Sequence, residues 1–305
     1  MADPTVPTLN IDSLGPSAQA GLCVQRHANH GNTAAHDHVF HEIVYIEAGS
    51  VEHETAAGRQ RLRPGDVIVL RPYVWHAYHD ARRLTLINCL FDGRLIRRFD
   101  DLLRAVPGSF DLYRRRERRP RSEAPIVLHC RPAQRPALLR RLDAIMAERE
   151  AGEPGWELAA TTGLLDVLLI VARLWGRVWS PPQVELPART EQALFDTVIY
   201  LEDHYTELVD LEYLARRVKL SRWHLSRSFS RRMGMGVIEY IHRLRIEEAC
   251  RRLRLGNEPI GRIAMELGYG EIAYFTRRFR SLMGQSPRQY RADRRGQAPH
   301  AMVEY

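Results

Sequence analysis

The sequence has little cysteine, a single lysine and no long uninterrupted apolar run. Its four cysteines lie far apart and form no C-x-x-C pair: Cys23, Cys89, Cys130 and Cys250. This usage predicts reduced thiols in a cytoplasmic protein. The most apolar stretch, residues 163–175, is interrupted by Asp166 and Arg173. It falls short of the ~20 apolar residues that span a bilayer, so no membrane partner is expected. The first ten residues show no basic and apolar leader, and no secretory signal is expected either.

Length and composition are those of a globular protein. The chain has 305 residues, which is room for about two domains of 100–200 residues each. Hydrophobic residues make up 45% and charged residues 27%, which supplies enough apolar material for folded cores. This balance excludes a disordered chain, a collagen and a coiled-coil rod.

Charge is distributed unevenly along the chain. Lys and Arg number 45 against 37 Asp and Glu, and all the cations but Lys219 are arginine, a bias that codon usage in a GC-rich genome explains equally well. Residues 191–212 hold seven acids and no base, whereas residues 213–295 hold 20 bases and seven acids, a net charge of +13. A localised basic segment is an electrostatic footprint for nucleic acid.

The N-terminal third has a β pattern. Residues 1–20 are rich in Pro, Ser, Gly and Ala, which predicts a mobile arm. From residue 22 to residue 91, short runs of β-branched and aromatic residues alternate with Gly, Pro and Asp turns, which predicts a small barrel or sandwich. The basic run RRRERRPR at 114–121 is typical of a solvated loop, with DNA contact as the alternative.

The remaining two thirds have a helical pattern. Apolar residues at helical spacing predict helices at 136–150 and at 156–179. The second has Leu158 and Leu168 along one side, and its apolar surface must be covered by the β domain, the other helix or another subunit. Residues 190–295 then contain an internal repeat of 49 to 50 residues. It pairs Leu225 with Phe275, and five further pairs: Ala215 with Ala264, Val218 with Leu267, Phe229 with Phe279, Gly234 with Gly284 and Tyr240 with Tyr290. Such a repeat predicts two copies of one supersecondary unit.

Each copy has the pattern of a helix-turn-helix. The first reads DLEYLARRV, a turn at Lys219–Leu220, and SRWHLSRSFSRRMG, with Asp210 and Ser221 as expected N-caps. The second reads EPIGRIAMEL, a turn at Gly268–Gly270, and EIAYFTRRFRSLMG. The second helix of each copy buries aromatic residues on one face and displays arginine on the other, as a recognition helix requires. The helix expected between the copies, 237–254, spans ~27 Å and would place them about one DNA turn apart. The alternative is two structural hairpins with solvated arginines.

Residues 190–295 resemble the DNA-binding domain of the AraC/XylS transcription regulators. The motifs that carry the resemblance are SRWHLSRSFSRRMG, IHRLRIEEACRRL and PIGRIAMELGYGEIAYFTRRFRSLMGQSPRQYR. The resemblance implies base and phosphate contacts from both recognition helices, through Trp223, Ser226, Arg227, Ile272, Ala273, Tyr274 and Arg277. Ile272 and Ala273 depart from the more polar residues common there. They would contact thymine methyl groups, or the second helix would mainly grip the backbone.

Eight of the 13 histidines lie between residues 27 and 79. Among them stands a His36-x-His38-x3-Glu42 motif, followed by Pro64-Gly65-Asp66 and by His76. These are similar to the two cupin motifs, in which such residues converge inside a small barrel. Three imidazoles and a carboxylate suit a first-row divalent metal, so His36, His38, Glu42 and His76 are candidate metal ligands. The alternative is that they bind a small effector or hydrogen-bond the barrel interior.

The whole N-terminal stretch resembles the rhamnose-responsive branch of the AraC/XylS family. The carrying segments include HDHVFHEIVYIEAGSVEHE and LRPGDVIVLRPYVWHAYHD. The resemblance implies a pocket for a small molecule such as a sugar, lined by the histidine motif together with Arg71, Trp75 and Tyr78. The candidate effector-binding residues are His36, His38, Glu42, Arg71 and His76.

The sequence therefore predicts an α+β multidomain protein. Its expected parts are a flexible arm (1–20), a cupin-like jelly-roll barrel that senses an effector (21–100), a loop and dimerisation helices (101–180), a linker (181–189), an all-α double helix-turn-helix (190–295) and a tail (296–305). The expected function is sequence-specific transcription regulation, and activation follows from the family. The expected partners are promoter DNA, a small-molecule effector, RNA polymerase and a second copy of the chain. The alternatives are a metal-sensing regulator and, from another class, a cupin metalloenzyme with an accessory helical domain.

Overall fold

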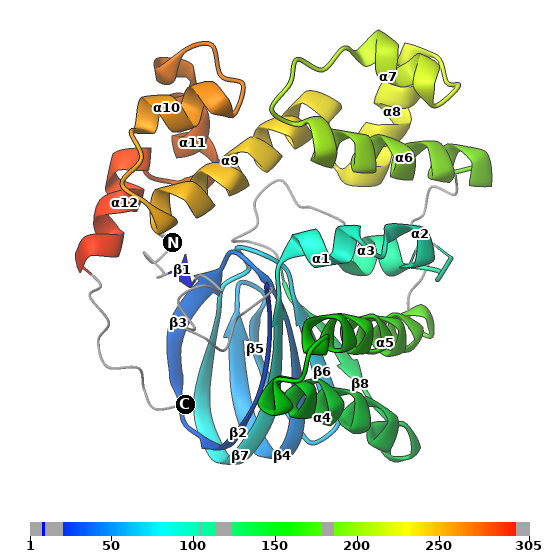
Figure 1. Ribbon diagram of the computed structural model, residues 1–305, viewed down its shortest axis with the longest axis vertical. Coiled ribbons are helices and arrows are strands. Elements are labelled where there is room, and N and C mark those ends of the chain that lie inside the picture. The colour runs from blue at the N-terminus through cyan, green and yellow to red at the C-terminus, as the bar shows by residue number, and fades with distance from the viewer. Residues whose placement is uncertain (1–7, 10–20, 104, 114–123, 179–185, 297–305) are drawn as a thin grey trace. The chain divides into compact units, whose positions relative to one another are not determined.

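Figure 1 shows the protein as a computed structural model, which describes residues 8–9, 21–103, 105–113, 124–178 and 186–296. The described residues fall into two units, which divide at about residue 180. The predicted arm, basic loop, linker and tail lie largely outside the described residues, including the run 114–121.

The first unit is built on an eight-stranded sheet. Its strands are β1 (Thr8–Leu9), β2 (Leu22–His30), β3 (Thr33–His38), β4 (His41–Thr55), β5 (Gly58–Leu62), β6 (Asp66–Leu70), β7 (His76–Phe91) and β8 (Ile126–His129). The two long strands, β4 and β7, pair antiparallel, and each also carries two short neighbours. Strands β2 and β3 pair with different parts of β7, and β5 and β6 with different parts of β4. All pairs are antiparallel except β1 with β3.

Alternate residues of these strands face two different cores. On β4, Ile43 and Tyr45 belong to a core shared with the helices, while Val44 and Ile46 belong to a second core that contains strand residues and Val74 but no helix residue. Both faces are apolar because the sheet folds over itself on one side and is covered by helices on the other. The predicted cupin-like barrel is confirmed in its architecture, although β8 lies beyond the expected end at residue 100.

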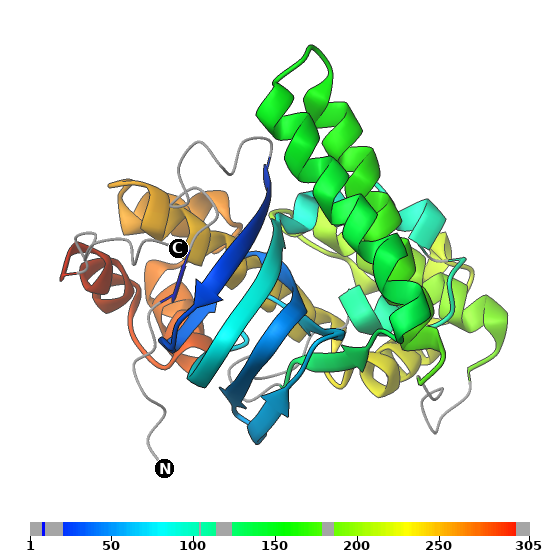
Figure 2. The same ribbon diagram turned by 90° about the horizontal axis from the view of Figure 1, so that it is seen from below.

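Helices cover one face of this sheet. They are α1 (Gly93–Arg97), α2 (Asp100–Leu103), α3 (Ser109–Tyr113), a 3-10 turn (Pro132–Gln134), α4 (Arg135–Ala151) and α5 (Trp156–Gly176). Figures 1 and 2 show α4 and α5 side by side as an antiparallel hairpin. Both predicted helices are confirmed, and of the apolar residues expected along one side of α5, Leu168 is buried whereas Leu158 is 73% exposed.

Helix α5 also contains the most apolar stretch of the described chain. By length and composition it is long and apolar enough to cross a membrane, contrary to the expectation from its interrupted sequence. Seven of its residues are nevertheless buried in the core that it shares with the sheet and α4: Ala160, Leu164, Val167, Leu168, Val171, Ala172 and Leu174. This packing is that of a core helix.

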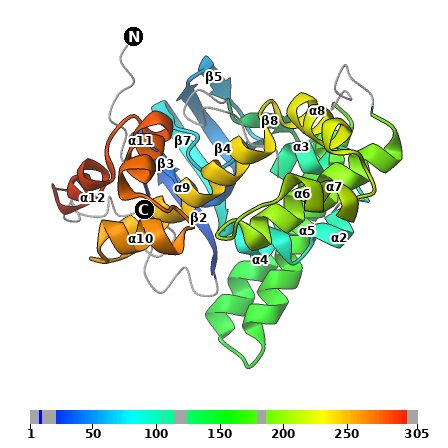
Figure 3. The same cartoon turned by 90° about the horizontal axis from the view of Figure 1, so that it is seen from above.

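The second unit is entirely helical in the described residues. Its helices are α6 (Ala188–His204), α7 (Leu211–Arg217), α8 (Arg222–Met233), α9 (Val237–Leu255), α10 (Ile260–Glu266), α11 (Ile272–Met283) and α12 (Pro287–Gly296). Helix α6 begins inside the segment expected to be a linker. Figures 1 and 3 show α9 running between α6–α8 at one end and α10–α12 at the other.

The internal repeat is visible in matching structural roles. Leu225 and Phe229 of α8 are fully buried, as are Phe275 and Phe279 of α11. Both of these helices end at a glycine in the left-handed conformation, Gly234 and Gly284 with φ of 68° and 75°. The helix-turn-helix prediction is therefore confirmed in both copies.

The helix starts agree with the expected caps. The Asp210 carboxylate accepts from the backbone N–H of Glu212 at 2.8 Å, and the Ser221 hydroxyl accepts from that of His224 at 3.2 Å. These bonds satisfy amide donors that a helix start leaves open. The chain enters α10 through Pro259, which is the N-cap residue.

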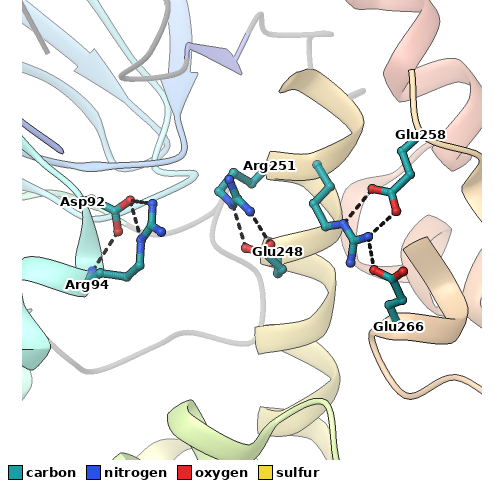
Figure 4. A network of polar contacts seen from close by, with 7 residues as sticks. Asp92, Arg94, Glu248, Arg251, Glu258 and Glu266 are labelled. Atoms are coloured by element: carbon teal, nitrogen blue, oxygen red, sulfur yellow. Dashed lines mark hydrogen bonds and ion pairs between the residues drawn. The ribbon is translucent and has the colours of Figure 1, made fainter. Parts of the chain in front are cut away.

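Two glutamates hold the end of α9 near the start of α10. The Arg252 guanidinium pairs with Glu258 and with Glu266, and Arg262 also pairs with Glu266, at 2.8 Å. Figure 4 shows Glu258 and Glu266 in this network, together with the separate Arg251–Glu248 pair on α9. In the first unit, Asp92 caps α1 and pairs with Arg94, also drawn in Figure 4. All four cysteines are buried, and none of them forms a disulfide.

Candidate functional site

The histidine motif forms a cluster inside the folded sheet. The Nε2 atom of His38, at the end of β3, lies 3.1 Å from Oε2 of Glu42, at the start of β4. The Nε2 atom of His76, the first residue of β7, lies 3.6 Å from the same oxygen. All three side chains are buried, and one ligand atom from each lies within 4.8 Å of the others. Residues of three strands thus present two nitrogens and a carboxylate to one point.

Hydrogen bonds behind the cluster fix the direction of these rings. The Nδ1–H of His38 donates to the carbonyl of Phe40 at 2.7 Å, so a neutral His38 ring presents a lone pair toward Glu42. His76 Nδ1 lies 3.3 Å from Nε2 of His53, which leaves the His76 Nε2 atom facing Glu42. Neither Nε2 atom has a hydrogen-bond donor aimed at it among the described residues. Lone pairs that face a carboxylate call for a proton or a cation between them.

Burial and mutual proximity shift the ionisation of the cluster. Burial, reinforced by the neighbouring histidines, lowers the pKa of His76 well below its usual value, and burial lowers that of His53 to about 4. Burial would raise the pKa of Glu42, but the hydrogen bond and charge of His38 outweigh it, and the pKa lies below its usual value. Glu42 is therefore ionised near pH 7, and His76 and His53 beside it are neutral there.

Of the five candidate effector-binding residues, His36 and Arg71 do not point to the same place as His38, Glu42 and His76. The half-buried His36 ring packs against His76 with centroids 4.3 Å apart, but its Nδ1 atom donates to the carbonyl of Ala34 at 3.0 Å, and it is not in the converging set. Arg71 donates to the backbone carbonyl of Asp111 in α3 at 2.7 Å and makes no described contact with the cluster. Tyr78 is buried beside His76, with ring centroids 5.5 Å apart.

His53 is a cluster residue that the sequence motif did not include. It lies on β4 and its ring is 5.4 Å from that of His76, between centroids. The pairing of β4 with β7 shifts register three times between Ile46 and Glu52. Each shift changes which residues face the interior, so strand alternation counted from Glu42 does not find His53.

In the second unit, the predicted residues of α8 lie on its outward face. Trp223 is 66% exposed, Arg227 is exposed and Ser226 is half-buried. The Arg227 guanidinium lies 4.9 Å from the centroid of the Trp223 ring. An aromatic ring that packs against a guanidinium group fixes the orientation of its N–H donors. Such planar donors suit a phosphate or a guanine edge.

Helix α11 displays a corresponding face. Arg277, at the repeat position of Arg227, lies 5.9 Å from the centroid of the Tyr274 ring. Ala273 is exposed, whereas Ile272 directs its Cδ1 atom to within 2.8 Å of where a Cβ on Gly261 would stand. Part of the Ile272 side chain is therefore used for packing on α10, and the rest remains outward.

Ion pairing separates structural from outward arginines. Buried Arg232 and Arg243 pair with Glu191 and Glu247, and Arg278 pairs with Glu239 at 2.8 Å. No described carboxylate pairs with Arg227 or Arg277. Arg227 and Arg277 are thus available to an anion outside the protein.

Comparisons with known proteins agree with both halves of this description. Residues 21–168 match the profile of an AraC-like ligand binding domain, and residues 214–293 match a helix-turn-helix domain. The chain is 27% identical over 281 residues to an HTH-type transcriptional activator RhaS of Escherichia fergusonii, covering 92% of this chain and 95% of that one. It is also 27% identical over 261 residues to RhaS of Klebsiella pneumoniae, covering 85% and 87%. Among solved structures, fatty-acid-bound ToxT of Vibrio cholerae aligns over 90% of this chain and 95% of its own, at 14% identity and a TM-score of 0.47.

Proposed function

The chain belongs to the AraC/XylS family of transcription regulators, and from that premise we propose how its two units act. The second unit reads two segments of double-stranded promoter DNA through the outward faces of α8 and α11. The first unit binds a small effector in the folded sheet and controls that reading. The protein works in the cytoplasm as a regulator and not as an enzyme.

The observation that carries DNA binding is that two arginines at matching positions have no carboxylate partner among the described residues. Arg227 and Arg277 occupy the same position in two copies of one unit, and each lies against an exposed aromatic ring. Helix α9 has 19 residues, or about 28 Å at 1.5 Å per residue, close to the 34–36 Å between successive major-groove segments. Trp223, Ser226, Ala273 and the exposed part of Ile272 complete the proposed contact surfaces.

Titration of the full chain with a promoter duplex at several salt concentrations tests this proposal. Each phosphate that the protein neutralises lowers the slope of log K against log salt by about 0.9. We expect a steep negative slope for the wild type. An affinity that does not change with salt would contradict binding to the DNA backbone.

For the effector we propose a polyhydroxylated molecule of monosaccharide size. The family relatives named RhaS support a sugar, and the buried carboxylate, imidazoles and Tyr78 hydroxyl offer both donors and acceptors to hydroxyl groups. A ligand at 100 times its Kd stabilises the folded protein by about 2.7 kcal/mol. Thermal unfolding is therefore measured with each of a panel of monosaccharides, L-rhamnose included, and at least one of them should raise the Tm. If none of them changes the Tm, a sugar effector is contradicted.

A divalent metal ion is the second candidate for the same pocket. The specific observation in its favour is that the Nε2 atoms of His38 and His76 both face Glu42. Their Nδ1 atoms lie within hydrogen-bonding distance of the Phe40 carbonyl and of the His53 ring. This is the support that metal-bound histidines commonly have. The residues fit a first-row ion: His38, Glu42 and His76 would hold it, and its charge would order the pocket or bind an effector oxygen.

Metal content of the purified full chain tests this candidate. A metal site predicts about one ion per chain after gel filtration, and a visible Co²⁺ spectrum after chelation and reloading. The isosteric change Glu42→Gln should remove both, and His79→Ala should remove neither because His79 pairs with Glu54 outside the cluster. Absence of bound metal in the wild type would leave a protonated imidazole as the partner of Glu42.

We further propose that the protein acts as a homodimer through the α4–α5 hairpin and recruits RNA polymerase. The hairpin supports this because the apolar side chain of Leu158 on α5 is 73% exposed. Sedimentation of the full chain should give a dimer mass. A wild-type monomer at micromolar concentration with DNA present would contradict the proposal.

A further inference from the structure

Three hydrogen-bonding rings run from the inside of the second helix-turn-helix to its outward face. The Tyr269 hydroxyl, in the turn before α11, lies 3.2 Å from Nδ1 of His242 on α9. The Nε2 atom of the same imidazole lies 3.0 Å from the hydroxyl of Tyr274 on α11. The relay Tyr269–His242–Tyr274 therefore connects a buried group to the proposed DNA-binding surface.

Burial changes steeply along this relay. Tyr269 and His242 are buried, and their rings stack with centroids 5.6 Å apart, whereas Tyr274 is 38% exposed. The Tyr269 hydroxyl has one hydrogen-bond partner among the described residues, namely His242 Nδ1. The Tyr274 hydroxyl likewise has one described partner, His242 Nε2.

The charge on His242 decides how protons are placed along the relay. Burial, with Arg278 and Arg245 nearby, lowers the pKa of His242 to about 4, although Glu239 acts in the opposite direction. The imidazole is therefore neutral near pH 7 and has one N–H and one lone pair. It can donate to one tyrosine only and must accept from the other.

The two possible arrangements differ in what they leave buried. If Nδ1–H donates to Tyr269, the buried Tyr269 O–H has no described acceptor, which is costly in the interior. If Tyr269 donates to Nδ1 instead, Nε2–H donates to the Tyr274 oxygen, and every buried proton is used. The second arrangement leaves the Tyr274 O–H proton on the exposed side.

We propose that His242 and Tyr269 hold the Tyr274 hydroxyl with its proton directed outward, as a neutral donor to a DNA phosphate beside α11. The inference rests on the proposed DNA-binding function. A phosphate suits this donor because its oxygens only accept, and because Arg277 lies over the same ring and attracts an anion. His242 and Tyr269 are positioning residues, since neither reaches the surface.

The binding test uses the full chain with its selected duplex and with a random duplex, each at several salt concentrations. Tyr274→Phe should weaken binding about ten- to a hundredfold on both duplexes, the net effect of one hydrogen bond to a charged group. The salt slope should stay unchanged because a neutral donor releases no counterion. Arg277→Ala is the matched control and should reduce that slope by about 0.9 if its guanidinium contacts a phosphate.

His242→Phe tests the positioning role, because it keeps a ring against Tyr269 and removes both hydrogen bonds. It should weaken binding as much as Tyr274→Phe, and the double variant should lose no more than either single variant. His242→Gln, which retains one donor and one acceptor, should recover part of the affinity. Independent losses that add in the double variant would overturn the positioning role.

Nitrogen-15 NMR of the His242 ring shows directly which ring nitrogen carries the proton. The His242 signals are assigned as those missing from the spectrum of His242→Gln. The proposal requires the neutral Nε2–H form at pH 7, and the Nδ1–H form or an imidazolium would overturn it. Wild-type binding with no loss in Tyr274→Phe, or with loss on the selected duplex alone, would overturn the phosphate contact but not the proposed function. A wild type that binds no duplex would overturn both.

Discussion

Arg245 donates a hydrogen bond of 2.8 Å from Nη1 to the backbone carbonyl of Gly268, in the turn of the second helix-turn-helix. Its other nitrogens donate to the carbonyls of Tyr205 and Glu207, just after α6. One side chain on α9 thus ties the turn of the second copy to the segment that leads into the first. Three charge-assisted hydrogen bonds in a fixed fork hold this connection, which lysine could not reproduce.

This connection predicts an unequal response of two glycines to alanine. Gly268 and Gly284 have nearly the same φ, 78° and 75°, so each alanine bears a similar conformational cost of about 1 kcal/mol. A Cβ at Gly268 would stand 2.2 Å from the carbonyl oxygen of Thr206, whereas one at Gly284 meets nothing within 4 Å. We expect Gly268→Ala to cost about 2–4 kcal/mol in total and Gly284→Ala about 1 kcal/mol.

Urea unfolding of the two full-length variants, followed by helical circular dichroism, measures this difference. Equal destabilisation would show that the turn of the second copy can move away from Thr206. The account of a fixed turn would then be wrong.

Much of the fold could be predicted because its residues act locally. The caps Asp210 and Ser221 satisfy amides within three residues, and the repeat pairs Phe229 with Phe279 at a constant spacing. Helical periodicity likewise located α4 and α5. Such features depend on neighbours in sequence, which a single chain reveals.

The missed residues depend on distant contacts. His53 joins the histidine cluster only because register shifts in β4 turn it inward. His242 looks like one more polar residue of a long helix, and its role follows from two tyrosines at 27 and 32 residues' distance. No local pattern encodes these two roles.

The two outward arginines should divide the recognition of DNA between them. Arg227→Ala should relax base preference in one half of the site, at about 1–3 kcal/mol if the contact to guanine is bidentate, and Arg277→Ala in the other half. Binding to a set of singly substituted duplexes measures this division. Equal losses on specific and random DNA would identify both arginines as phosphate contacts.

Stability of the second unit should fall between pH 6.5 and pH 4 through His242. Its folded pKa of about 4 lies below the unfolded value of about 6.5, so the unfolded state binds more protons in this window. The stabilisation is complete above the unfolded pKa and is lost as pH falls, by about 1 kcal/mol per pH unit. Arg278, Arg245, Glu239, Tyr269 and Tyr274 are the charged and titratable groups around this ring.

Thermal unfolding of the wild type and of His242→Gln at pH 5, 6 and 7 isolates this effect, because the other titrating groups are common to both. The wild type should lose more stability toward pH 5 than the variant. Parallel curves would mean that His242 titrates normally in the folded protein.

The pocket should control the response without being needed for DNA binding. The double change His38→Ala and His76→Ala removes both imidazoles that face Glu42, so it should abolish the change in DNA affinity that the effector causes. Basal affinity for DNA should remain, as it should in the control His79→Ala, which retains the response as well. Reporter transcription with the monosaccharide panel measures both, and a normal response in the double variant would place the pocket elsewhere.

The central claim is that two copies of one unit read two successive major-groove segments. The most direct measurement is selection of duplexes from a random double-stranded library by the full-length protein, followed by sequencing. The account predicts an enriched motif with two conserved elements about 10 base pairs apart, one of which degenerates in Arg227→Ala and the other in Arg277→Ala. A library that remains unenriched, or a motif with a single element that both variants affect alike, would contradict it.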